Sequence, residues 1–180
     1  MKKKFASTLV GAFLLAGATG GAQAATVDLG AVEIGTPLAF SGFAPVGVIN
    51  DIFTFSLPAN GGSGYSIVNF PLSIPGVGTF NAIFSSITLF SDPDGTPFTQ
   101  DDSFLTTASA GGPGVESLSL NFSGTGGGNM YLMINGVSNG TIGGLYSGAI
   151  SASPVPLPPA VWMLGSALVG LATVGRRKFS

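Results

Sequence analysis

The sequence contains neither cysteine nor histidine in its 180 residues. Without cysteine there can be no disulfide bonds, no thiolate-ligated zinc and no thiol catalysis. Without histidine, serine hydrolases lose their usual base and zinc loses its imidazole ligands. Neither absence identifies the cellular compartment, because exported proteins need not contain disulfides.

Basic residues are missing from the whole middle of the chain. Eight acidic residues and no basic ones lie between residues 25 and 153, so this part has a net charge of −8, which the whole-chain value of −2 conceals. Such a charge repels phosphate backbones, and we therefore expect no nucleic-acid binding. The same charge should attract cations. The six basic residues lie at the two ends: Lys2, Lys3, Lys4, Arg176, Arg177 and Lys178.

The first 24 residues have the layout of a secretory signal peptide. A basic start precedes an apolar run around residues 9–18, and Ala22 and Ala24 supply the small side chains that signal peptidase needs. We therefore predict cleavage after Ala24 and export of the protein. A short membrane anchor is the alternative, which the brevity of the apolar run disfavours.

Residues 154–180 combine prolines, an apolar stretch and a basic end. Residues 160–174 form an uncharged run of 15 residues. As a helix this run would span roughly 22 Å, which is less than a hydrocarbon core of about 30 Å. Arg176, Arg177 and Lys178 should anchor one end in the cytoplasm. The prolines keep the preceding strip extended, in a form that a protease can grip.

This order of features resembles the PEP-CTERM sorting signal of Gram-negative bacteria, in its V-P-L-P variant, which is also named after ice-binding proteins that carry it. The motif residues are Val155, Pro156, Leu157, Pro158 and Pro159, with Leu157 in place of the Glu of the literal motif. The resemblance implies that an exosortase, an intramembrane-type transpeptidase or protease, cuts near the motif. The protein would pass through the inner membrane and then be released or re-anchored. A C-terminal anchor that is never processed is the alternative.

Residues 25–153 have the pattern of one β domain, because short apolar or alternating runs recur between turn residues. Leu118, Leu120 and Phe122 alternate with polar residues, which is typical of a sheet with one buried and one wet face. We predict an all-β antiparallel sandwich, or a barrel-like variant, flanked by a signal-peptide helix and a C-terminal transmembrane helix. The clearest strands are expected at residues 50–57, 64–70, 82–90, 115–122, 129–135 and 142–151.

The stretch INDIFTFSL, residues 49–57, resembles the F-x-D-x-F signature of a group of PEP-CTERM proteins. Asp51 and Phe53 match the signature, and Ile49 replaces its first Phe. In a strand these three residues share one face. An aspartate among apolar neighbours needs hydrogen-bond donors, so we expect Asp51 to cap a loop, with metal or ligand contact as the alternative. The resemblance implies no particular activity.

The stretch SDPDGTPFTQDD, residues 91–102, contains half of the acidic residues. Its D-P-D-G segment has turn chemistry, and its spacing is not that of an EF-hand. A solvated turn is the expected structure. Calcium binding is the alternative, and no other cofactor is expected. The four carboxylates that could gather around calcium are those of Asp92, Asp94, Asp101 and Asp102.

The residue types of the middle argue against an enzyme. A serine nucleophile needs a base, and this part of the chain offers neither His nor Lys. Paired carboxylates, as in glycoside hydrolases, are the remaining catalytic chemistry, and the sequence shows no such pair. For contact with a glycan the candidates are Tyr65, Tyr131 and Tyr146, since the single Trp lies in the C-terminal stretch.

Taken with the PEP-CTERM resemblance, these features predict an exported, exosortase-sorted protein of the cell surface or extracellular matrix. Its role would be structural or one of interaction in an exopolysaccharide matrix or biofilm. The expected partners are signal peptidase, an exosortase, matrix components such as exopolysaccharide, and transiently the inner membrane. A calcium- or glycan-binding module of the same matrix is the first alternative. A carboxylate-dependent glycoside hydrolase is the second.

Overall fold

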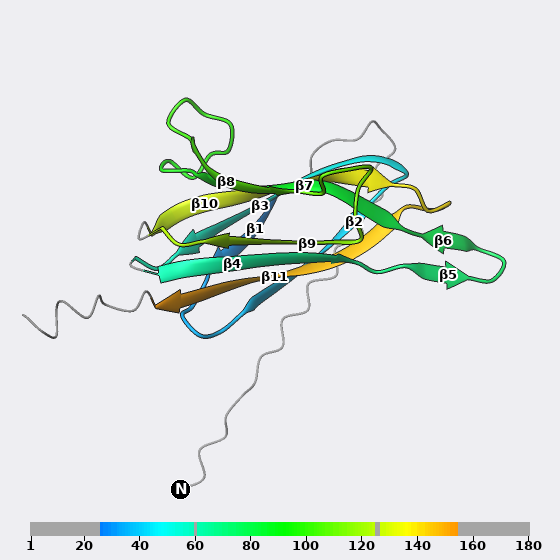
Figure 1. Ribbon diagram of the computed structural model, residues 1–180, viewed down its shortest axis with the longest axis horizontal. Helices are drawn as coiled ribbons and strands as arrows, with labels where there is room; N and C mark the ends of the chain where they lie inside the picture. The colour runs from blue at the N-terminus through cyan, green and yellow to red at the C-terminus, as the bar shows by residue number, and fades with distance from the viewer. Residues whose placement is uncertain (1–25, 60, 125–126, 155–180) are drawn as a thin grey trace, which may run out of the picture.

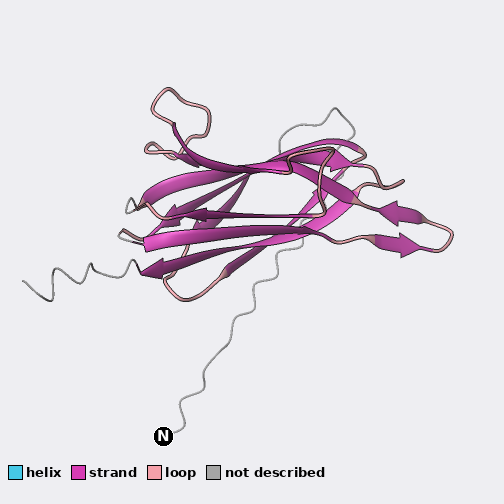
Figure 2. Cartoon of the chain, in the orientation of Figure 1, coloured by secondary structure: helices cyan, strands magenta, loops and turns pink. Residues whose placement is uncertain are grey.

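A computed structural model describes residues 26–59, 61–124 and 127–154, which fold into an all-β sandwich (Figures 1 and 2). This confirms the predicted fold class. In the described ranges no helix is long and apolar enough to cross a membrane. The signal peptide with its cleavage site, the Val155 to Pro159 motif, the C-terminal helix and the basic end lie outside the described residues. Those features stay predictions.

Eleven strands are formed by the described residues. One sheet has five strands in the order β1-β3-β10-β7-β8, the second has four in the order β2-β11-β4-β9, and β5 and β6 form a separate hairpin. The strands are β1 Thr26–Ala31, β2 Leu38–Ala44, β3 Gly47–Leu57, β4 Gly61–Asn69, β5 Leu72–Ile74, β6 Gly78–Phe80, β7 Ala82–Ser91, β8 Ser103–Ser109, β9 Ser117–Phe122, β10 Gly128–Ser138 and β11 Gly144–Pro154.

The six predicted strands correspond to β3, β4, β7, β9, β10 and β11, with ends that shift by a few residues. The prediction missed β1, β2 and β8, which lie at sheet edges, and the short hairpin strands β5 and β6. Edge strands bury less of each face, so their apolar alternation is weaker: β1 has no buried residue and β8 has none either.

One strand pair departs from the predicted antiparallel arrangement. Strand β1 pairs with β3 in parallel, from Thr26 opposite Ile52 to Ala31 opposite Ser56, with an irregularity after Asp28. The other pairs within the two sheets are antiparallel. The irregular step of β1 contains Gly30, whose φ of +77° is the left-handed conformation that glycine adopts readily.

The core lies between the two sheets and follows the alternation of the sequence. On β3 the residues at every second position from Ile49 to Leu57 are buried, and on β9 Leu120 is buried between exposed polar neighbours. Rings from opposite sheets meet in the core, with centroids 4.4 Å apart for Phe40 and Phe53. This burial of apolar surface, aromatic and aliphatic, stabilises the sandwich.

Asp51 lies in the middle of β3, not in a loop as expected from the sequence, and its side chain is only 8% exposed. The hydroxyl of Tyr146, from β11 in the other sheet, donates a hydrogen bond to its carboxylate. The Tyr146 ring lies over Gly42, its paired residue on β2, where any Cβ would clash with it. The motif that resembles F-x-D-x-F therefore contributes a bond between the two sheets.

Candidate functional site

The outer face of the five-stranded sheet carries one row of residues that crosses all five strands, which we call the outer row. Asp28 is paired with Thr54, and Thr54 with Tyr131. Tyr131 is in turn paired with Phe90, and Phe90 with Phe104. The row therefore has a polar end on β1 and β3 and an aromatic end on β10, β7 and β8.

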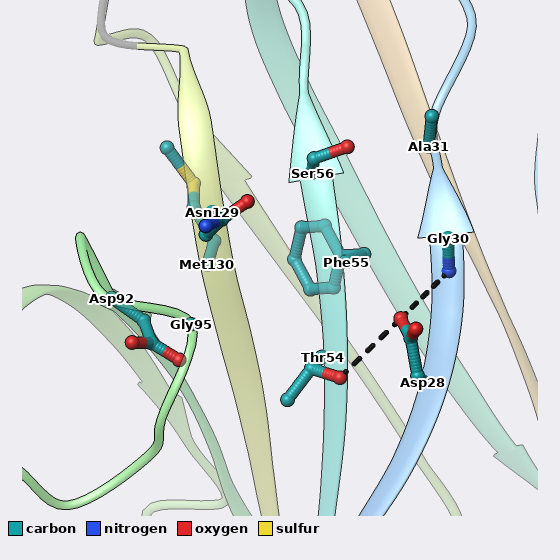
Figure 3. A pocket seen from close by; sticks show the side chains of 10 residues that line it. All are labelled: Asp28, Gly30, Ala31, Thr54, Phe55, Ser56, Asp92, Gly95, Asn129 and Met130. Carbon is teal, nitrogen blue, oxygen red and sulfur yellow. Dashed lines mark hydrogen bonds between the residues drawn. The ribbon is translucent and has the colours of Figure 1, made fainter.

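A groove of about 270 Å³ lies over the polar end of the outer row (Figure 3). The Asp28 carboxylate accepts hydrogen bonds from the backbone N–H of Gly30 at 3.0 Å and from the hydroxyl of Thr54 at 3.5 Å. Ser56 and Asn129 also line the groove. Its walls thus offer hydroxyl, amide and carboxylate groups to a bound molecule.

At the other end the rings form a continuous aromatic surface. Phe90 and Tyr131 are stacked with centroids 4.8 Å apart, and Phe104 meets Phe90 edge-on at 6.0 Å. Phe98 reaches over from the loop between β7 and β8, with its centroid 5.6 Å from that of Tyr131. Phe98 and Phe104 are 62% and 59% exposed, so two large apolar rings face solvent at the opposite end of the outer row from the groove.

Phe98 has a φ of +69° and is the one non-glycine residue with positive φ in the described part of the chain. For a bulky side chain this conformation is an outlier, and it persists where the surrounding structure requires it. The next residue is held in place, because the Thr99 N–H donates to Asp102 at 3.0 Å. The backbone of Phe98 is therefore held in a strained conformation, and its exposed ring lies against Tyr131 of the sheet.

The same loop begins with the turn that the sequence predicts. The N–H of Gly95 donates to the carbonyl of Asp92 at 3.2 Å, and Gly95 has a φ of +76°. The N–H of Thr96 donates to one carboxylate oxygen of Asp92 and to one of Asp94, both at 2.8 Å. The N–H of Asp92 donates to the carbonyl of Asn129 at 3.0 Å, which attaches the turn to β10.

Three of the four aspartates singled out in the sequence come together here. One carboxylate oxygen each from Asp92, Asp94 and Asp102 lies within 4.8 Å of the others. Asp101 is not in this group, and its carboxylate accepts a hydrogen bond from the Thr99 hydroxyl instead. We call Asp92, Asp94 and Asp102 the aspartate cluster. The turn expected from the sequence is present and most of residues 91–102 are exposed, but Asp92 departs from a solvated turn because it is only 1% exposed.

The cluster changes the ionisation of its members and neighbours. Burial raises the pKa of Asp92 above its ordinary value, and the carboxyls of Asp94 and Asp102 raise it further, although the N–H of Thr96 acts in the opposite direction. The hydroxyl of Tyr131 donates to Asp102 at 3.3 Å. Burial and the charge of Asp102 raise the pKa of Tyr131 to about 12.

The structure revises which aromatic residues could contact a glycan. Tyr65 and Tyr146 are both 2% exposed and belong to the core, and Tyr131 is equally buried under Phe98. In the aromatic end of the outer row and the loop that covers it, the rings that face solvent are Phe98 and Phe104; elsewhere Phe43 and Phe70 are 54% and 59% exposed. Sequence reasoning missed Phe98 and Phe104 because it considered Trp and Tyr as platforms, although a lone Phe inside the acidic loop was a visible clue.

The fold and these side chains together define an all-β sandwich with an acidic loop and an aromatic row on one outer face. No family model and no curated protein matches the chain. Among solved structures, the pre-peptidase C-terminal domain of a collagenase from Bacillus anthracis is similar with a TM-score of 0.39 and 15% identity, over 73% of this chain and 100% of that one. PliG of Aeromonas hydrophila, a periplasmic inhibitor of g-type lysozyme, is similar with a TM-score of 0.35 and 10% identity, over the same shares of the two chains. At these scores neither likeness bears on the function of this chain.

Proposed function

We propose that this chain is an exported interaction protein of the cell surface or extracellular matrix, and that the outer row binds matrix polysaccharide. The observation that carries the proposal is the combination of two exposed rings, Phe98 and Phe104, with a polar groove at the opposite end of the same row of residues. Export and sorting by an exosortase rest on the two terminal segments, which resemble a signal peptide and a PEP-CTERM signal.

A sugar is the occupant that suits this combination of groups. The apolar C–H face of a pyranose ring stacks on an aromatic ring, and the hydroxyls of other sugars along the same polysaccharide need donors and acceptors. Phe98 and Phe104 offer the first, and Asp28, Thr54 and Asn129 offer the second. The absence of basic residues from this part of the chain favours a neutral polysaccharide over an acidic one.

A binding role has more support than hydrolysis. Asp28 and Asp92 are the two carboxylates that line the groove, so they are the pair that a glycoside hydrolase would use. Asp92 is 1% exposed, and one of its oxygens accepts the Thr96 N–H, so it does not present an acid to a bound sugar. We therefore propose that the protein is not an enzyme.

Affinity electrophoresis tests the binding proposal. The full chain, in a nonionic detergent, is run in native gels that contain dextran, a neutral glucan, or alginate, an acidic polysaccharide. We expect dextran to retard the protein, and Phe98→Ser and Phe104→Ser to abolish the retardation. Phe43→Ser is the matched control, because Phe43 is 54% exposed on β2 in the other sheet. If Phe43→Ser lost its retardation by dextran to the same extent, or if dextran did not retard the unaltered chain, the outer row would not be the binding face.

Intact-mass analysis tests export and sorting separately. Protein recovered from whole cells and from the medium is weighed. A species that lacks residues 1–24 and 160–180 is expected. A species that keeps Arg176, Arg177 and Lys178 would mean a membrane-tethered protein, and the matrix assignment would lose its support.

A further inference from the structure

The aspartate cluster has no cationic side chain to balance it. Between Lys4 and Arg176 the sequence contains no Lys, Arg or His, so no described residue can form an ion pair with Asp92, Asp94 or Asp102. Carboxylates that share a site without a counter-ion repel one another, and a proton or a bound cation relieves the repulsion.

Burial adds a second, independent feature. Only 1% of Asp92 is exposed to solvent. Its carboxyl faces those of Asp94 and Asp102. Oxygen Oδ2 of Asp92 and oxygen Oδ1 of Asp102 are buried and have no hydrogen-bond partner. A buried carboxylate oxygen without a partner is costly, so such an oxygen calls for a ligand.

We propose that Asp92, Asp94 and Asp102 bind one calcium ion. Calcium takes six to eight oxygen ligands at about 2.3–2.6 Å, so oxygens up to 4.8 Å apart can share one ion. Magnesium ligands lie at about 2.0–2.1 Å in a strict octahedron and would have to come closer together. Water molecules and further carboxylate oxygens complete the coordination.

Calcium bound here would fasten the loop between β7 and β8 to the sheet. Asp92 and Asp94 belong to the turn at the start of the loop, whereas Asp102 lies at its end, next to β8. One ion would therefore join the two ends of the loop that carries Phe98. The proposal rests on the carboxylates alone and does not depend on polysaccharide binding by the outer row.

Terbium luminescence tests the site directly, because Tb³⁺ replaces calcium and is sensitised by a nearby tyrosine. The hydroxyl of Tyr131 lies 3.3 Å from Asp102, so excitation of tyrosine in the full chain should produce terbium emission. Calcium should displace the terbium, and magnesium at the same concentration should not. Calcium should also raise the melting temperature over that measured in a chelator.

Asp102→Asn and Asp101→Asn form a matched pair of variants, since each removes one negative charge from neighbouring positions. Asp102→Asn should weaken terbium and calcium binding by about tenfold or more, because it replaces a charged carboxylate ligand by a neutral amide. Asp101→Asn, outside the cluster, should change binding less than about twofold. In chelator, Asp102→Asn should melt no lower than the unaltered chain, because it relieves repulsion, which shows that the variant folds.

Two results would overturn the proposal. One is the absence of both terbium emission and a calcium-dependent rise in melting temperature at millimolar calcium. The other is equal loss of binding in Asp101→Asn and Asp102→Asn, since that would mean diffuse attraction by the acidic surface and not a site. Retardation by dextran is measured separately, so failure of calcium binding and failure of polysaccharide binding can be told apart.

Discussion

At the scale of single residues, the contact between Tyr146 and Asp51 depends on a glycine. Tyr146 passes over Gly42 to reach a carboxylate on the opposite sheet, and no side chain fits at position 42 while the ring stays there. Burial and the charge of Asp51 raise the pKa of Tyr146 above its ordinary value, so its hydroxyl keeps its proton and remains a donor.

We predict that Gly42→Ala lowers the free energy of unfolding by about 1–3 kcal/mol, because the added methyl group displaces the Tyr146 ring from Asp51. Urea unfolding followed by circular dichroism measures the change. Gly112→Ala is the matched control: no atom lies within 4 Å of a Cβ at that position, and the change should stay within about 0.5 kcal/mol. Equal stability of the two variants would mean that Tyr146 can reach Asp51 by another path.

A second prediction at this scale concerns alkaline pH. Burial raises the pKa of Tyr65 to about 12, and burial with the charge of Asp102 raises that of Tyr131 to about 12, against 10.0 for an ordinary tyrosine. The unfolded chain therefore loses these protons at lower pH than the folded chain. Stability is intact below pH 10 and should fall as the pH rises from 10 to 12. Thermal unfolding at closely spaced pH values, with absorbance of tyrosinate as the monitor, checks this; a flat melting temperature up to pH 12 would contradict it.

At the scale of elements, the hairpin of β5 and β6 is attached through three asparagine side chains. The hairpin extends beyond the end of the sandwich (Figure 1). Asn69 donates to Asn81 at 2.7 Å, and Asn81 donates to Asn139 at 2.6 Å. The side-chain amide oxygen Oδ1 of Asn69 accepts the backbone N–H of Ala82 at 2.9 Å, at the buried start of β7. Asn69 and Asn81 flank the hairpin, so they fix both of its ends.

We predict that Asn69→Ala destabilises the fold by about 1–3 kcal/mol, because the buried N–H of Ala82 loses its acceptor. Hydrogen exchange should also become faster at β5 and β6. Asn50→Ala, at an exposed position on β3, serves as the control and should cost no more than about 0.5 kcal/mol. Unchanged exchange in the hairpin of Asn69→Ala would show that the strands hold without this connection.

Central and edge strands differ in how clearly the sequence predicts them. Central strands such as β3 and β10 are recognisable because their inner face packs on the other sheet, so that every second residue is buried over most of the strand. The edge strand β8 contains Ser, Thr and Phe without a buried position, so its pattern resembles that of a loop. The parallel pairing of β1 with β3 leaves no trace in either segment alone.

At the scale of the whole molecule, the acidic and basic residues are separated along the chain, with all the bases at the two ends. Eight acidic residues lie between the basic ends without one base among them, so the folded domain concentrates negative charge. Asp92 is the extreme case, since burial and two neighbouring carboxyls raise its pKa.

We predict that, in chelator, the melting temperature rises as the pH is lowered from neutral toward the ordinary pKa of an aspartate, about 4. The folded state binds a proton at Asp92 more tightly than the unfolded chain does, so protonation favours folding. Sodium chloride should also raise the melting temperature at pH 7, because it screens the repulsion between the carboxylates of the folded domain. Melting curves across pH and salt test this. A melting temperature that falls throughout this pH range would contradict it, and Asp92→Asn should remove most of the pH effect.

The sequence by itself determined the all-β class, the central strands, the segregation of charge and the turn that begins with Asp92. These features are local: alternation assigns a residue to a face of its own strand, and D-P-D-G sets its own dihedral angles. The separation of Asp101 from the aspartate cluster, the outer row and the position of Phe98 were decided only by the tertiary structure. The outer row joins residues from Asp28 to Tyr131, and a periodic pattern does not say which strands become neighbours or in which register. Burial of Asp92 likewise follows from the packing of its loop on β10, a contact between segments that lie far apart in the chain.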